Sequence, residues 1–122
     1  VKVVLCQEQV PCGAVAATTL QKAGLTVTPV SRETDVKAVL TKVSLNEADA
    51  GLVYVTDVRA AADKVIGIEI PAELNTSTDY PIAAITSGSG DATKRATAQA
   101  FVDFVLSAAG DTVLERAGFA TR

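Results

Sequence analysis

Histidine, methionine and tryptophan are absent from this chain of 122 residues, and aromatic residues make up only 4% of it. Without histidine the chain has no imidazole base, no triad that contains one and no histidine metal ligand, so catalysis would fall to carboxylates, cysteines or the two tyrosines. Because methionine is missing even at position 1, we expect the parent protein to extend upstream of Val1. The composition favours a function other than catalysis, and we expect no enzyme activity, no resident metal and no cofactor.

Positive charge and long apolar runs are also scarce. Eleven Lys and Arg stand against 14 Asp and Glu, a formal net charge of −3, so the chain has no basic stripe and few aromatics for base stacking. We therefore expect no nucleic-acid partner. No apolar run approaches the roughly 20 residues that span a bilayer, and Val1–Leu5 is too short for a signal peptide core. With 48% hydrophobic residues, the sequence predicts a soluble globular chain with a buried core.

Strand-like and helix-like segments alternate along the chain. Val1–Leu5 leads through Pro11-Cys12-Gly13, called the Pro-Cys-Gly corner below, into an Ala-rich helix that Gly24 stops. Continuous apolar strands alternating with helices are typical of a parallel sheet covered on both faces, so the sequence predicts an α/β fold. The predicted strands are Val1–Leu5, Thr26–Val30, Ala50–Val55, Lys64–Ile70 and Tyr80–Thr86. The predicted helices are Gly13–Ala23, Val36–Asn46, Val58–Ala62, one that follows Asp91, and Asp111–Ala117.

The last third of the chain differs in character. A flexible Ser/Gly break, residues 87–90, precedes Asp91, which we expect to cap a helix. That helix has an apolar face that needs a surface to cover. The face consists of Ala98, Phe101, Val102, Val105 and Leu106.

Three turns of the predicted sheet suit an anion. Ligands of parallel α/β sheets collect at the carboxyl ends of the strands, where the first N–H groups of helices have no internal partner and face the positive end of the macrodipole. The turns are the Pro-Cys-Gly corner, Thr34-Asp35-Val36, and Tyr54 at the end of its strand. Each also has a purely structural interpretation, since Asp35 can be a helix cap and Tyr54 a packed side chain. Spacing alone leaves both interpretations open.

A set of short motifs, in order over nearly the whole chain, resembles the molybdate-binding proteins of ABC importers. The motifs are Val10-Pro11-Cys12-Gly13, Asp35-Val36-Lys37, Ala48-Asp49-Ala50-Gly51-Leu52-Val53-Tyr54, Asp57, Tyr80-Pro81-Ile82-Ala83 and Ala117-Gly118-Phe119. The resemblance implies part of a type II periplasmic-binding-protein fold. In that fold residues 1–79 would form the second lobe, and residues 80–122 would form a returning hinge strand and C-terminal helices that pack toward a first lobe missing from this chain.

The resemblance also implies a ligand and partners. The ligand is a tetrahedral oxyanion, molybdate or tungstate, and the sequence does not distinguish the two. The matching donors are the backbone N–H of Cys12, the backbone N–H of Val36 and the hydroxyl of Tyr54. The implied partners are the missing N-terminal lobe and a membrane ABC permease, and the implied location is extracytoplasmic, periplasmic or anchored outside the cell membrane. Uncovered helix faces favour association of this chain with that lobe or as a homodimer. Because half of the site is missing, we expect weak oxyanion binding.

The two cysteines, Cys6 and Cys12, flank the loop before the Pro-Cys-Gly corner. Their spacing is neither the redox C-x-x-C nor a zinc pattern, so it leaves a disulfide or two packed thiols. The extracytoplasmic location that the resemblance implies favours the disulfide, which would brace the loop and keep the Cys12 N–H in place.

Two other functions remain open at this stage. One is the effector-binding domain of a transcription regulator with the same fold, and the other is a small α/β enzyme that uses Tyr54 or a cysteine. The charged residues near the turns receive a structural interpretation, because nothing in the sequence pairs or desolvates them. They are Glu8, Arg32, Glu33, Asp35, Lys37 and Lys42.

Overall fold

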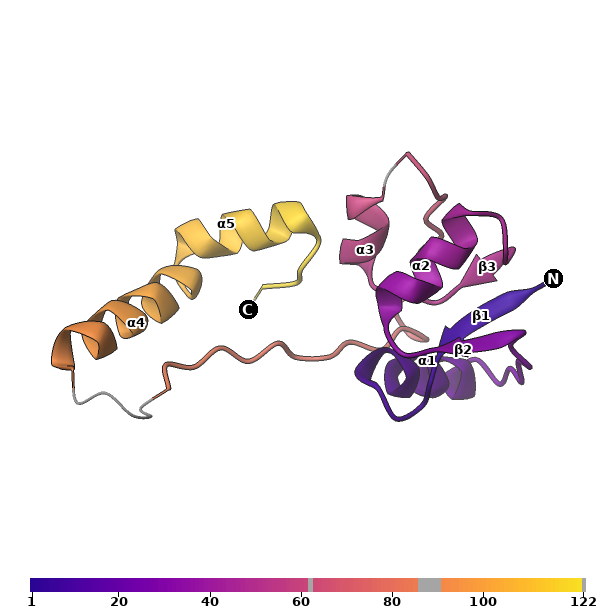
Figure 1. The fold of residues 1–122 in the computed structure, drawn as a ribbon, viewed down its shortest axis with the longest axis horizontal. Helices are drawn as coiled ribbons and strands as arrows, with labels where there is room; N and C mark the ends of the chain where they lie inside the picture. The colour runs from indigo at the N-terminus through magenta and orange to yellow at the C-terminus, as the bar shows by residue number, and fades with distance from the viewer. Residues whose placement is uncertain (62, 86–90, 122) are drawn as a thin grey trace. The chain divides into compact units, whose positions relative to one another are not determined.

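The computed structural model describes residues 1–61, 63–85 and 91–121, which fall into two compact units, Val1–Thr78 and Asp79–Arg122. In the stretches described, no helix combines the length and the apolar character needed to cross a membrane. The elements, labelled as in Figure 1, are β1 (Val3–Cys6), α1 (Pro11–Lys22), β2 (Ser31–Glu33), α2 (Val36–Ser44), β3 (Ala50–Gly51), α3 (Val55–Ala60), α4 (Ala92–Val105) and α5 (Ala108–Ala117).

A parallel sheet with the strand order β2-β1-β3 forms the centre of the first unit. In its register Val4 of the central strand pairs with Ser31 on one side and with Gly51 on the other. Parallel neighbours require crossover connections, which α1 supplies between β1 and β2 and α2 supplies between β2 and β3. Figure 1 shows these helices on opposite sides of the sheet. The predicted α/β fold with a parallel sheet between helices is confirmed.

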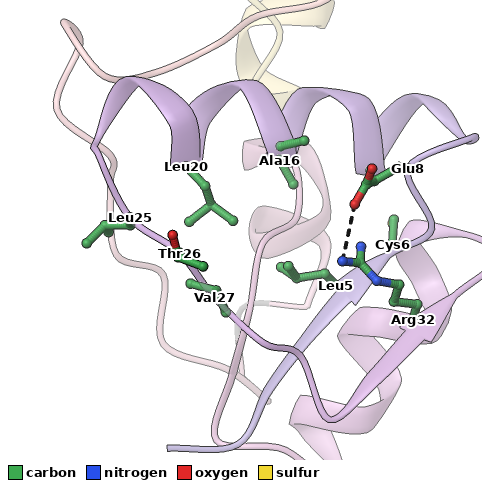
Figure 2. Close-up of a pocket in the computed structure, with 11 residues that line it drawn as sticks. Leu5, Cys6, Glu8, Ala16, Leu20, Leu25, Thr26, Val27 and Arg32 are labelled. Carbon is green, nitrogen blue, oxygen red and sulfur yellow. Dashed lines mark ion pairs between the residues drawn. The ribbon is translucent and has the colours of Figure 1, made fainter.

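The core follows from the alternation of side chains along β1. Val4 joins Val39 of α2 and Ala48 in one buried cluster, which also contains Cys6 and Cys12, and Val4 and Val39 have no exposed surface. Leu5, the next residue along the strand, lies beneath α1 on the other face of the sheet (Figure 2). The central strand is therefore buried on both faces, as the apolar run at the start of the sequence indicates.

Helix α1 begins two residues before the predicted start, Gly13, and ends one residue before the predicted end, Ala23. Pro11 is its first residue, a position where the missing N–H of proline costs nothing. After the helix, Gly24 adopts a left-handed φ of 65°, with hydrogen bonds from Gly24 N–H to Gln21 O and from Leu25 N–H to Leu20 O. This pair of bonds is a Schellman motif, and it confirms Gly24 as the helix stop.

The second strand lies later in the chain than predicted. The apolar segment Thr26–Val30 is not a strand, although Val30 N–H donates to Val3 O, and the ladder is formed by Ser31–Glu33. β2 is an edge strand, and its polar side chains find partners outside the core, so its pairing carries no apolar signature. The strand predicted at Thr26–Val30 from its apolar pattern is therefore wrong.

The third strand is shorter than predicted, and the helix after it starts earlier. Only Ala50–Gly51 pairs with β1, and Val55, predicted as strand, is the first residue of α3. The turn predicted at Thr56-Asp57 and the helix start predicted at Val58 are therefore also wrong, because these residues lie inside α3. The Asp57 carboxylate accepts the Tyr54 N–H at 3.1 Å, which starts the helix at this point. The predicted end of that helix, Ala62, lies outside the described residues.

Two further predicted strands are absent from the described chain. Lys64–Ile70 is not a strand, and Ile66 and Ile68 are 92% and 88% exposed. Residues 80–85 are likewise not a strand, and Thr86 and the Ser/Gly break at 87–90 lie outside the described residues. An apolar segment becomes a strand only where a neighbour supplies its hydrogen bonds. These predictions were wrong because the pattern reports apolar character, which does not itself provide a partner.

The second unit is built from α4 and α5. Asp91 caps α4, as predicted, by accepting the Thr93 and Lys94 N–H groups, and Ser107 caps α5. Because of that Ser107 cap, α5 starts at Ala108, ahead of the predicted Asp111. The helix ends as predicted, before Gly118, whose φ is 103°. Of the predicted apolar face only Val102 is buried, whereas Phe101 and Leu106 remain 62% and 63% exposed.

Candidate functional site

The three turns selected in the sequence lie at one end of the sheet. β1 leads into α1 at the Pro-Cys-Gly corner, β2 leads into α2 at Val36, and β3 leads to Tyr54 at the start of α3. Because the three strands are parallel, their carboxyl ends point the same way. Val36 and Tyr54 also pack against the buried cluster that contains Cys12. The structure thus brings the three predicted residues to one sheet end, and their role toward a ligand stays a prediction.

The start of α1 presents a backbone donor without an acidic neighbour in its own first turn. Pro11 has no N–H, so the first amide of the helix belongs to Cys12. The next two amides, of Gly13 and Ala14, donate to Val10 O at 3.0 and 3.1 Å. The N-cap residue Val10 makes no side-chain cap, and the first turn contains no Asp or Glu. This helix end retains the positive potential of its dipole.

A disulfide joins Cys6 to Cys12, with the two Cα atoms 5.8 Å apart. It connects the last residue of β1 to the second residue of α1, and both cysteines are buried, at 1% and 8% exposure. The prediction of a disulfide is confirmed.

Gly13 contributes to the corner in a way that the sequence analysis missed. A Cβ built on Gly13 would overlap the carbonyl oxygen of Gln7, because the loop after β1 folds back onto the helix. Glycine just inside a helix costs stability relative to alanine, so its presence here was a signal of close backbone approach. The Pro-Cys-Gly corner therefore needs the glycine for space.

The N-cap residue of α2, Asp35, caps the helix with its side chain. Asp35 accepts the Ala38 N–H at 2.9 Å, which confirms the cap interpretation of Asp35. This bond engages the third residue of the helix, whereas the predicted donor, Val36, is the first. The Asp35 carboxylate is also a negative charge close to that amide, so it works against an anion there and makes α2 the weaker of the two helix starts.

Tyr54 is the N-cap residue of α3. Its N–H donates to the Asp57 carboxylate, and its half-buried side chain packs against the buried cluster of Val4, Cys6 and Val39. The packed-side-chain interpretation of Tyr54 is thus correct for its ring.

Most of the charged residues near the turns are paired. Arg32 binds Glu8 at 3.2 Å on the surface, and Lys42 Nζ lies 2.8 Å from Glu33 Oε1 and 3.0 Å from Ser31 Oγ. The hydrogen bond from Lys42, aided by Ser31, holds the pKa of the Glu33 carboxyl below its usual range. Sequence reasoning missed both pairs, since only the fold brings these residues together.

Because the pKa of Glu33 is lowered in the folded chain, the free energy of unfolding should decrease at acid pH. The contribution of Glu33 is fully present above the unfolded pKa of about 4.3 and is lost as the pH falls through the lower folded value. We expect Glu33→Gln to be less stable than the unsubstituted chain at neutral pH, with the difference closing as the pH falls below the unfolded pKa and through the lower folded one. Urea unfolding followed by circular dichroism at several pH values measures it. A difference that stays constant with pH would contradict the assignment.

Neither of two pockets in the described part of the first unit is lined by Cys12, Val36 or Tyr54. One cavity of about 200 Å³ lies between the sheet and α1, with aliphatic side chains along most of its wall and the Glu8–Arg32 pair at one side (Figure 2). A second, of about 440 Å³, is lined by residues of α2 and α3 together with Asp63 and Lys64. The cation that lines the first, Arg32, is already paired with Glu8.

The sequence of this chain is similar to those of known proteins. A family model described as bacterial extracellular solute-binding protein matches residues 1–120. The chain belongs to this family. It is 40% identical over 118 residues to the molybdate-binding protein ModA of Mycobacterium tuberculosis and to that of Mycobacterium bovis, covering 97% of this chain and 44% of each relative. It is 30% identical over 115 residues to ModA of Escherichia coli, covering 92% of this chain and 43% of that protein. No solved structure gives a significant match.

Membership confirms the family resemblance predicted from the ordered motifs and agrees with the parallel α/β sheet. The chain spans less than half the length of these curated relatives.

Proposed function

We propose that this solute-binding chain supplies part of a site for a tetrahedral oxyanion, molybdate or tungstate. The observation that carries the proposal is the meeting of Cys12, Val36 and Tyr54 at the carboxyl end of one parallel sheet. The 40% identity to molybdate-binding proteins supports molybdate as the ligand. Bound there, the anion would accept hydrogen bonds from the N–H of Cys12, the N–H of Val36 and the hydroxyl of Tyr54.

Neutral donors suit a protein that must release its cargo. A hydrogen bond to a charged group contributes about 1.5–3 kcal/mol, and a helix end adds about 0.3–1 kcal/mol. Three such contacts have to offset the ordering cost of binding, and the Asp35 carboxylate reduces the gain at α2. The chain alone is therefore a weak binder, with an expected Kd in the range of about 10 μM to 1 mM.

A second segment of the parent protein would complete the site. The relatives are more than twice as long as the matched region, which supports a further lobe that closes on the oxyanion. The exposed apolar side chains of α4, Phe101 and Phe104, are a surface that such a lobe, or a second copy of the chain, would cover. We propose that the whole protein works outside the cytoplasm, delivers the oxyanion to an ABC permease and performs no catalysis. The family match supports this role over the effector domain of a regulator and over a small enzyme.

Isothermal titration calorimetry of the chain with molybdate, tungstate, sulfate and nitrate tests the proposal. Molybdate and tungstate should bind with nearly equal, weak affinity, because their size and charge are alike, and planar nitrate should give no binding heat. No molybdate binding up to several millimolar, or equal binding of nitrate, would contradict oxyanion recognition. Tight molybdate binding would instead contradict the need for a second lobe.

A further inference from the structure

The Cys6–Cys12 disulfide spans the corner on which the strongest proposed donor lies. It ties the end of β1 to the start of α1, and the Cys12 N–H belongs to the same residue as one of the bridged sulfurs. Any change in the bridge therefore acts directly on the position of that amide.

Apart from the disulfide, backbone hydrogen bonds and a close backbone contact hold the corner in place. Val10 N–H donates to Gln7 O at 3.1 Å, and the same carbonyl lies against Gly13. Neither α1 nor its N-cap residue adds a side-chain cap. The disulfide is thus a covalent constraint on a turn that is otherwise held by backbone hydrogen bonds.

The corner is also linked to the start of α2. Gln7 N–H donates to Glu33 O at 2.8 Å, and the Glu33 carboxylate binds Lys42 of α2 at 2.8 Å. Glu33 is the last residue of β2 and stands just before the cap of α2. Motion of the loop after Cys6 would therefore reach both helix starts.

We propose that the Cys6–Cys12 disulfide is a redox-sensitive positioning element that sets the oxyanion affinity of this sheet end, an inference that rests on the proposed function. Reduction by a dithiol adds two electrons and two protons to the bridge: the S–S bond breaks, two thiols form, and the dithiol leaves as its cyclic disulfide. The freed corner samples more conformations, so binding has to order it and affinity falls. Because both sulfurs are buried, reduction requires local opening of the corner and proceeds slowly.

The test compares molybdate titrations of the oxidised and the reduced chain. The protein is reduced with dithiothreitol, which is removed under argon before calorimetry, and a Cys6→Ala, Cys12→Ala double variant given the same treatment is the matched control. We expect reduction to raise the Kd about tenfold, because binding then has to order the freed corner, and reoxidation to restore it. The double variant should bind like the reduced chain with or without treatment.

Amide hydrogen exchange separates positioning from unfolding. On reduction the amides of Val10 and Gly13, which donate to Gln7 O and Val10 O, should exchange faster, while those of Val4 and Val39 in the core keep their protection. Equal Kd values for the oxidised and reduced chains would overturn the inference and leave the proposed function standing. Absence of binding by the oxidised chain would overturn both, and loss of core protection would show that the bridge maintains the fold and does not position the site.

Discussion

Replacing Gly13 with alanine is expected to lower the free energy of unfolding by about 3 kcal/mol. The new Cβ would overlap the Gln7 carbonyl, a backbone atom held in place by the Val10 hydrogen bond and by the disulfide beside it. Alanine favours a helix over glycine by only about 0.5–1 kcal/mol, so the clash outweighs the gain in propensity. Urea unfolding followed by circular dichroism measures the loss, and molybdate affinity should fall with it because the Cys12 amide is displaced.

Gly24→Ala is the matched control for this prediction. Gly24 has a left-handed φ of 65° but nothing within 4 Å of a built Cβ, so its substitution carries the backbone cost of about 1–2 kcal/mol and no clash. It should also leave molybdate affinity unchanged. If Gly13→Ala were no more costly than Gly24→Ala, the close approach of Gln7 to the helix would not matter to the corner.

Tyr54→Phe should weaken molybdate binding about tenfold to a hundredfold. The substitution removes the hydroxyl and keeps the ring that packs against the buried cluster, so stability should change little. The expected loss is that of one hydrogen bond to a charged acceptor, about 1.5–3 kcal/mol. Titration calorimetry gives the affinity, and thermal unfolding checks the fold.

The chain offers Tyr80→Phe as the control. Tyr80 belongs to the second unit, where its ring makes an edge contact with Phe119 at a centroid distance of 5.6 Å. Losing this hydroxyl should leave the affinity as it is. An unchanged affinity in Tyr54→Phe, or an equal loss in both variants, would remove Tyr54 from the proposed site.

The parts of the fold that could be predicted are those with a local cause. Gly24 fixes the end of α1, Asp35 fixes the start of α2, and the apolar run of β1 reports its burial on both faces. Each of these signals acts within a few residues, and the structure agrees with each.

The errors arose where pairing or charge decides the structure. Ser31–Glu33 is a strand because β1 accepts it as an edge neighbour, and its polar side chains pair with Glu8 and Lys42. The apolar Lys64–Ile70 is not a strand, because apolar character without a neighbour gives no ladder. Sequence pattern measures hydrophobicity, and a sheet also requires partners that are distant along the chain.

In the candidate site, too, some features could be predicted from the sequence and others depend on tertiary contacts. The position of the helix starts and of Tyr54 at one sheet end follows from strands that alternate with helices, and the choice of these residues as donors came from the resemblance to molybdate-binding proteins. The close approach at Gly13 and the link from Gln7 to Glu33 depend on tertiary geometry, which no local pattern carries.

The central claim is that the carboxyl end of the sheet binds a tetrahedral oxyanion through backbone amides, and amide chemical shifts of the isotope-labelled chain test it most directly. Titration with molybdate should move the Cys12 and Val36 amide resonances most, saturably, while those of α4 and α5 stay nearly constant. Largest shifts at any other place, or no saturable shift at Cys12 and Val36, would contradict the account.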